Sequence, residues 1–116
     1  MRVLAHEKGF MPMYNLLKAN KQKNKAMLEA IENIQQQLEN SDRPLGIRHK
    51  IDNIPQKYKT RYKLPALYHF EMPDNYRLMY TVERSPDDDN KEVIFLELLT
   101  HDEYNKLFGY FKKRSH

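Results

Sequence analysis

Arg77, His101 and Tyr104 are the residues of this chain whose types and positions best suit chemistry on a charged substrate. Arg77 lies within residues 76–82, where apolar side chains alternate as in a strand, and the other two follow the apolar run 93–99. A guanidinium binds phosphate oxygens through a planar fork, and an imidazole exchanges protons near neutral pH. A tyrosine ring can stack on a base or orient a hydroxyl. The question that the sequence raises is whether these three side chains form one site or lie on the surface for structural reasons.

Each of these residues also has a purely structural interpretation, which the sequence leaves open. Arg77 can pair with Glu97 across the expected sheet, because an unpaired, half-buried arginine is costly. His101 stands where a terminal helix is expected to begin. Tyr104 can be the first apolar residue of that helix.

Positive charge is concentrated in the first part of the chain. Residues 1–63 carry a formal charge of +7, and residues 64–116 carry −3. The cations between positions 43 and 63, where the single acid is Asp52, are Arg43, Arg48, Lys50, Lys57, Lys59, Arg61 and Lys63. Such a segment is typical of phosphate contact, and also of a solvated loop. The last four cations alternate, so an extended backbone would align them along one phosphate track.

Residues 12–41 are predicted to form a helical hairpin. A short helix is expected from about 12 to 20, and a stronger one from about 24 to 40. In the second helix, Met27, Ile31, Ile34 and Leu38 form one apolar stripe. Residues 42–66 then form a basic connector interrupted by prolines, including Pro44 and Pro55.

An antiparallel sheet is predicted within residues 67–99. Its strands are expected at 67–72, 76–83 and 92–99, with residues 2–5 as a weak further edge strand. Alternation directs Leu78, Tyr80 and Val82 toward the helical hairpin and Arg77 to the opposite face. We expect that face to be open or partly covered by the terminal helix.

The terminal helix is predicted over residues 100–114. Thr100 and Glu103 have the spacing of a capping box at its start. The whole chain, residues 1–116, is therefore expected to be one α+β domain. Its predicted fold class is a helical hairpin packed on a small antiparallel sheet of three to four strands, with a short C-terminal helix.

The composition argues against several classes of protein. The absence of cysteine excludes disulfides and thiolate metal sites. No stretch reaches the roughly 20 apolar residues of a membrane helix. The first residues lack the apolar core of a signal peptide, so a cytoplasmic location is expected. The histidines show no paired spacing and the few glycines make no phosphate loop, so neither a metal nor a cofactor is expected.

Four segments carry a resemblance to a known family. They are Gly46-x-x-His49-Lys50-Ile51, Tyr68-His69-Phe70, Tyr76-Arg77-Leu78-Met79-Tyr80-Thr81-Val82, and residues 96–104. Across residues 46–104 the chain resembles the RelE/ParE toxin superfamily of toxin–antitoxin pairs. It departs from that pattern in its weak first strand, in the long stretch 55–66, and in lacking a clear carboxylate base.

The resemblance implies a RelE-like toxin: a metal-free endoribonuclease, or mRNA interferase, that cleaves mRNA on the ribosome and is neutralised by a cognate antitoxin. It makes Arg77, His101 and Tyr104 the catalytic candidates. The RNA-binding candidates are His49, Lys50, Lys57, Lys59, Arg61 and Lys63. His69 is interpreted as a surface histidine that can also join the site. The alternative is a non-enzymatic protein of the same fold, such as a ParE-like gyrase inhibitor or a member that has lost activity.

Overall fold

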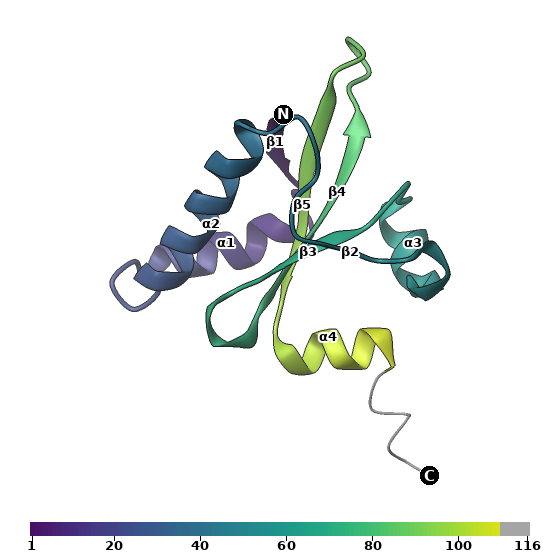
Figure 1. Ribbon diagram of the computed structural model, residues 1–116. Helices are drawn as coiled ribbons and strands as arrows, with labels where there is room; N and C mark the ends of the chain where they lie inside the picture. The colour runs from purple at the N-terminus through teal and green to yellow at the C-terminus, as the bar shows by residue number, and fades with distance from the viewer. Residues whose placement is uncertain (110–116) are drawn as a thin grey trace.

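The computed structural model describes residues 1–109 and contains a five-stranded mixed sheet with the strand order β1-β5-β4-β3-β2. Helices lie on both sides of this sheet (Figure 1). The elements in chain order are β1 (Arg2–Ala5), α1 (Phe10–Ala19), α2 (Lys25–Glu39), β2 (Ile47–Arg48), η1 (Ile51–Asn53), α3 (Gln56–Tyr62), β3 (Tyr68–Glu71), η2 (Pro73–Asn75), β4 (Arg77–Arg84), β5 (Lys91–Leu99) and α4 (His101–Phe108). The predicted α+β class is confirmed. No helix in the described part of the chain is long and apolar enough to span a membrane.

Helices α1 and α2 form the predicted hairpin and cover one face of the sheet (Figure 1). The predicted stripe of α2 is buried: Met27, Ile31, Ile34 and Leu38. These side chains join one core cluster with Leu78 and Tyr80 of β4. Leu78 and Tyr80 therefore face the helical hairpin, as the alternation of residues 76–82 predicts.

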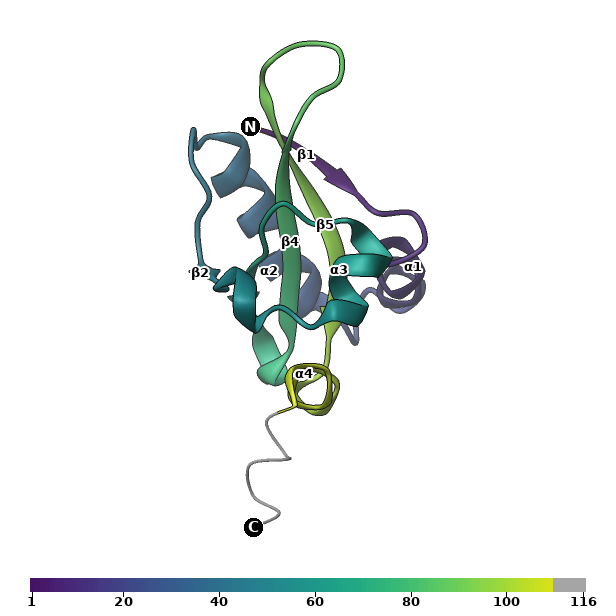
Figure 2. The same cartoon turned by 90° about the vertical axis from the view of Figure 1, so that its right-hand side faces the viewer.

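The opposite face of the sheet is covered more completely than the sequence predicts. Besides α4, the connector contributes η1 and α3 to this face, and Figure 2 shows α3 in front of β4 and β5. Ile54 and Tyr58 from the connector, Met79 and Leu96 from the sheet, and Tyr104 from α4 form a second core cluster. The expectation of an open face is wrong, because the connector carries its own apolar anchors.

The sheet has more strands than predicted, and it is not purely antiparallel. The weak edge strand β1 pairs in parallel with β5, so the first strand lies beside the last. The connector supplies the fifth strand, β2, which pairs antiparallel with β3. Gly46 precedes β2 with a φ of 80°, and a Cβ there would lie 2.6 Å from the carbonyl oxygen of His69. Only glycine fits this close approach without strain.

Strands β4 and β5 pair along their length with one register shift. Met79 lies opposite Glu97, and Tyr80 lies opposite Phe95, so Leu96 is an extra residue on β5. A bulge of this kind re-aims the side chains that follow it. Here it allows both Leu96 and Glu97 to face α3, with Leu96 in the second core cluster and Glu97 in contact with Arg61.

The segment that was expected to be extended is helical. Gln56–Tyr62 forms α3, and Lys63 ends it in the left-handed region with a φ of 52°. Successive residues of a helix differ by about 100° in direction, so the alternating lysines do not share one face. The aromatic pair Tyr58 and Tyr62, four residues apart, instead faces inward, with ring centroids 4.9 Å apart.

Helix α4 begins at the predicted capping box. The Thr100 side chain accepts from the Glu103 backbone N–H, and the Glu103 carboxylate accepts from the Thr100 backbone N–H at 2.9 Å. The helix ends at Phe108, with Gly109 as its cap. The remainder of the predicted range, 110–114, lies outside the described residues.

The hydroxyl of Tyr80 ties the connector to the centre of the sheet. It accepts from the Leu45 backbone N–H at 2.9 Å and donates to the Leu45 carbonyl oxygen. Burial raises the pKa of Tyr80 to about 12, so the hydroxyl keeps its proton and can donate. The residue itself is fully buried. These bonds hold the segment that leads into β2.

We expect Tyr80→Phe to lower the free energy of unfolding by about 1 to 2 kcal/mol, because both polar groups of Leu45 lose their partner. Urea denaturation at pH 7 measures this difference. Tyr14→Phe is the matched control, since Tyr14 contacts the same core and its hydroxyl has no hydrogen bond within residues 1–109. Equal losses in the two variants would contradict the proposed role of the Tyr80 hydroxyl.

Candidate functional site

Two histidines, an arginine and two aromatic rings gather where β3, β4 and α4 meet. We call this group the histidine–arginine cluster, and its members are His49, His69, Arg77, Tyr104 and Phe108. Figure 1 shows α4 at the end of the sheet, away from the N-terminus. Arg77 and Tyr104, predicted as catalytic, and His49, predicted as RNA-binding, are thus brought together. His69 completes the group.

The histidine pair depends on the pairing of β2 with β3. Ile47 lies opposite His69 in this register, and the next residue pair is Arg48 with Tyr68. The His49 backbone N–H then donates to the Leu67 carbonyl oxygen at 2.9 Å, which extends the ladder. In this position His49 Nε2 lies 2.7 Å from His69 Nδ1. One ring must donate and the other accept.

Both histidines favour the neutral form. His69 is 4% exposed, so its interpretation as a surface histidine is wrong. Burial first, and then the nearby His49 and Arg77 charges, together lower the pKa of His69 to about 4. Burial also lowers the pKa of His49. A neutral pair makes one N–H···N hydrogen bond, whereas two charged rings would repel each other.

Arg77 begins β4 on the face that α4 covers. Its Nη1 donates to the carbonyl oxygens of Asn75 at 2.8 Å and of Tyr76 at 3.4 Å. Its guanidinium carbon lies 5.2 Å from the centre of the Tyr104 ring, a cation–π geometry. Hydrogen bonds among residues 1–109 do not use its Nε or Nη2. The alternative pairing with Glu97 is not formed, because Glu97 pairs with Arg61 at 3.5 Å.

Helix α4 covers the cluster with aromatic rings. The Tyr104 ring lies 5.3 Å from the His69 ring, and the Phe108 ring stacks on His49 at 4.8 Å. Tyr104 and Phe108 are four residues apart, so one face of the helix presents both rings. The capping box fixes where α4 begins, and thereby positions the two rings that cover the cluster.

A groove runs beside the cluster, between α3 and α4. It has a volume of about 360 Å³. We call it the α3–α4 groove, and its walls are Pro55, Lys57, Arg61, Glu97, Leu99, Glu103, Lys106 and Leu107. Lys57 and Arg61 are predicted RNA-binding residues, and Lys106 adds a third cation. The groove thus brings positive charge next to the end of the sheet where the cluster lies.

Glu97 is a functional candidate that the sequence did not single out as such. Its side chain is 18% exposed and lies at the bulge of β5. Burial raises the pKa of Tyr58 and of Tyr62, and the neighbouring Glu97 carboxylate raises both further. The position of Glu97 within the apolar run 93–99 could have indicated a special role from the sequence. The neighbouring bulge could not have been predicted in the same way.

The remaining predicted residues lie apart from the cluster. His101 is exposed at the start of α4 and contacts Asn105, whose Nδ2 lies 3.0 Å from its Nε2. Within residues 1–109, no contact joins His101 to the cluster. Lys50 is exposed next to His49. Lys59 does not line the α3–α4 groove, and Lys63 lines a different hollow, beside the end of β4 and the start of β5.

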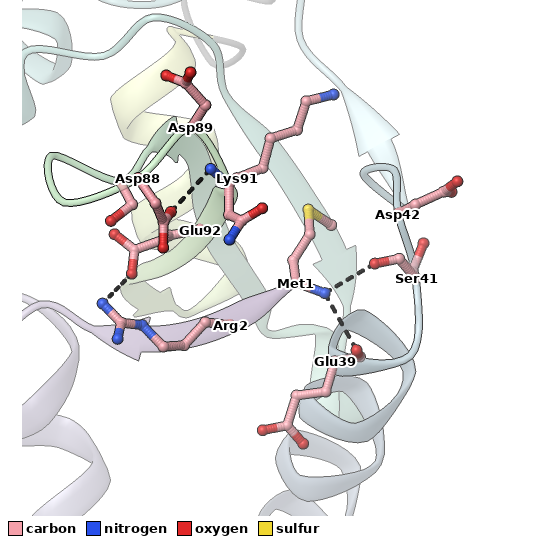
Figure 3. Close-up of a pocket in the computed structure, with 11 residues that line it drawn as sticks. Met1, Arg2, Glu39, Ser41, Asp42, Asp88, Asp89, Lys91 and Glu92 are labelled. Atoms are coloured by element: carbon pink, nitrogen blue, oxygen red, sulfur yellow. Dashed lines mark hydrogen bonds and ion pairs between the residues drawn. The ribbon is translucent and has the colours of Figure 1, made fainter.

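A wider hollow of about 740 Å³ lies near the N-terminus, at the far end of the sheet from α4 (Figures 1 and 3). Its lining includes several acidic residues, which Figure 3 labels. Arg2 forms an ion pair with Glu92, and the Met1 amine donates to the carbonyl oxygens of Glu39 and Ser41 at 3.2 and 2.9 Å. The ion pair joins β1 to β5, and the Met1 contacts join the start of the chain to the end of α2. The contacts of these residues stabilise the fold, and a structural role accounts for them.

Comparison with known proteins does not place the chain in a family. No protein-family model, no curated protein and no solved structure matches it. Within residues 1–109, no group of three or more His, Cys, Asp or Glu side chains is arranged to hold a metal ion.

The buried histidine pair makes folding depend on pH. A lowered pKa in the folded state means that the unfolded chain binds protons more readily. The contribution of His69 is therefore complete above its unfolded pKa of about 6.5 and is lost as the pH falls toward 4. His69→Asn keeps a polar atom near the Nδ1 position but does not titrate. We expect the wild type to lose about 2 to 3 kcal/mol more than this variant between pH 7 and pH 4.

Urea denaturation at several pH values between 7 and 4 measures this difference. Carboxylates titrate in the same range, so only the difference between variant and wild type is informative. His101→Asn is the control, because His101 is exposed and should leave the pH dependence unchanged. A pH dependence shared by the wild type and His69→Asn would show that the pair does not titrate with folding.

Proposed function

We propose that this protein is a metal-free endoribonuclease of the RelE kind, which cleaves mRNA on the ribosome and is neutralised by a cognate antitoxin. The observation that carries the proposal is the position of Arg77. Its guanidinium lies over Tyr104, beside the His49–His69 pair and near a groove lined by cations. These residue types supply charge stabilisation, proton transfer and base stacking without a metal.

Arg77 is proposed to bind the scissile phosphate. Nη1 is held by two backbone carbonyls, which fixes the plane of the guanidinium. Nε and Nη2 form the fork that binds two oxygens of a phosphate. A cation held in place before the reaction stabilises the charge that develops on the equatorial oxygens, at no cost of rearrangement.

The proton transfers are assigned to His49, within the cluster, and to His101, at the start of α4 outside it. The neutral His49 imidazole is half-buried and can accept the proton of the attacking 2′-hydroxyl, with His69 holding its orientation. The 2′-oxygen then bonds to phosphorus, and the bond to the 5′-oxygen breaks. His101, exposed one helical turn before Tyr104, remains the proposed donor of a proton to that leaving oxygen.

The α3–α4 groove is proposed to hold the RNA next to the scissile phosphate. Lys57 and Lys106 lie on its two walls, one on each helix. Lysine contacts to phosphates position a nucleic acid but carry no sequence information. Because Lys59 and Lys63 lie outside this groove, we expect them to add only long-range attraction.

We expect Arg77→Ala to reduce RNA cleavage by at least about a hundredfold and to relieve growth arrest on expression in bacteria. The reason is the loss of the charge that stabilises the transition state. Arg84→Ala is the matched control, because Arg84 lies on the same strand, is exposed, and should leave activity unchanged. Mapping of mRNA 5′ ends and growth curves measure the two effects, with thermal unfolding as the check on folding.

Arg77→Lys separates charge from geometry, since it keeps the charge but loses the fork, and we expect most activity to be lost. A folded Arg77→Ala variant with full toxicity and cleavage would overturn the site assignment. Growth arrest by the wild type without RNA cleavage, but with inhibition of DNA supercoiling by gyrase, would favour the ParE-like alternative.

A further inference from the structure

Glu97 takes no part in the reaction proposed above, yet the structure gives it an unusual setting. Glu97 lies opposite Met79, directly beside the bulge of β5, and its side chain lines the α3–α4 groove. Its side chain is 18% exposed, so it is mostly withdrawn from water. Bulges near ligand sites commonly re-aim one side chain in this way. A carboxylate held in a groove that combines apolar and charged side chains is suited to recognising a partner by hydrogen bonds.

Arg61 is the ion-pair partner of Glu97 in the absence of a ligand, and the Tyr58 and Tyr62 hydroxyls neighbour the same carboxylate. The closest contact, from Arg61 Nη1 to a Glu97 carboxylate oxygen, is 3.5 Å, and the Arg61 side chain is 48% exposed. A contact of this length between partly exposed groups is weak. The pair therefore presents adjacent acceptors and donors that can turn toward a ligand.

Guanine is the base whose edges match such a pair. Its N1–H and N2–H donors lie side by side and suit the two oxygens of a carboxylate. Its O6 and N7 acceptors follow along the same base and suit the fork of an arginine. Adenine, cytosine and uracil each place a ring acceptor or carbonyl where guanine has one of these donors, so a carboxylate disfavours them.

We propose that the α3–α4 groove is a guanine-binding subsite, in which Glu97 accepts from N1–H and N2–H and Arg61 donates to O6 and N7. The proposal rests on the proposed function, because it makes the guanine part of the RNA substrate. It assigns Glu97 and Arg61 to base recognition, and leaves Arg77 to the phosphate.

The walls of the groove fit a nucleotide. Leu99, Leu107 and Pro55 line the groove and supply apolar surface for the faces of the base. Lys57 and Lys106 lie at the same groove and are placed for the flanking phosphates. The volume of about 360 Å³ is within the range of small-molecule sites, roughly 300 to 1,000 Å³.

The test compares the four bases in one RNA context. Fluorescence anisotropy measures binding of the protein to the labelled pentamers UUGUU, UUAUU, UUCUU and UUUUU, and NMR titration measures binding of GMP, AMP, CMP and UMP. We expect UUGUU and GMP to bind at least about tenfold more tightly than their counterparts. Glu97→Gln should abolish this preference while keeping the weaker binding common to all pentamers. Arg61→Lys should reduce it, because the fork is lost.

Glu32→Gln is the matched control, since Glu32 is exposed on α2 and should leave the preference intact. Thermal unfolding shows whether each variant is folded. If all pentamers bind equally to the wild type, the guanine subsite is overturned while RNA binding stands. If no pentamer binds but GMP alone does, the subsite stands and the ribonuclease proposal fails. If no pentamer or nucleotide binds, both proposals fail.

Discussion

The ladder between β4 and β5 is the interaction on which the rest of this structure depends. Strand β5 pairs with β4 on one side and with β1 on the other, so it joins the beginning of the chain to its end. Both faces of this ladder are buried, one by the α1–α2 hairpin and the other by α3 and α4 (Figure 2). Each side chain on the ladder must therefore suit one of two cores, and polar side chains there need an explanation.

Two polar side chains at this ladder are explained by where they stand. Arg77 begins β4, where the sheet ends and α4 crosses, so its guanidinium reaches backbone carbonyls and an aromatic ring. Glu97 stands at the bulge, where the regular alternation is interrupted. The first belongs to the proposed phosphate site and the second to the proposed base site. The same face of the sheet thus carries both, separated by the side chains that anchor α4.

Much of the fold could be predicted from periodicity. The apolar stripe from Met27 to Leu38 predicted the buried face of α2, and the alternation around Leu78 predicted the buried face of β4. Both predictions were confirmed. The capping box was confirmed for the same reason, since it depends on residues only three positions apart. The helix α3 was missed, although Tyr58 and Tyr62 have helical spacing, because the alternating cations of residues 57–63 also suit a strand. The sequence carries two local patterns here, and the structure follows the helical one, in which Tyr58 is buried.

The sequence by itself determined the α+β class, the inward face of β4 and the start of α4, because local spacing controls which side chains share a face. Only the tertiary structure decided that His49 and His69, twenty residues apart, share a hydrogen bond. It also decided that Arg61, rather than Arg77, pairs with Glu97. These contacts depend on the strand order β1-β5-β4-β3-β2 and on one bulge. Both are set by long-range pairing, which no local pattern of residues encodes.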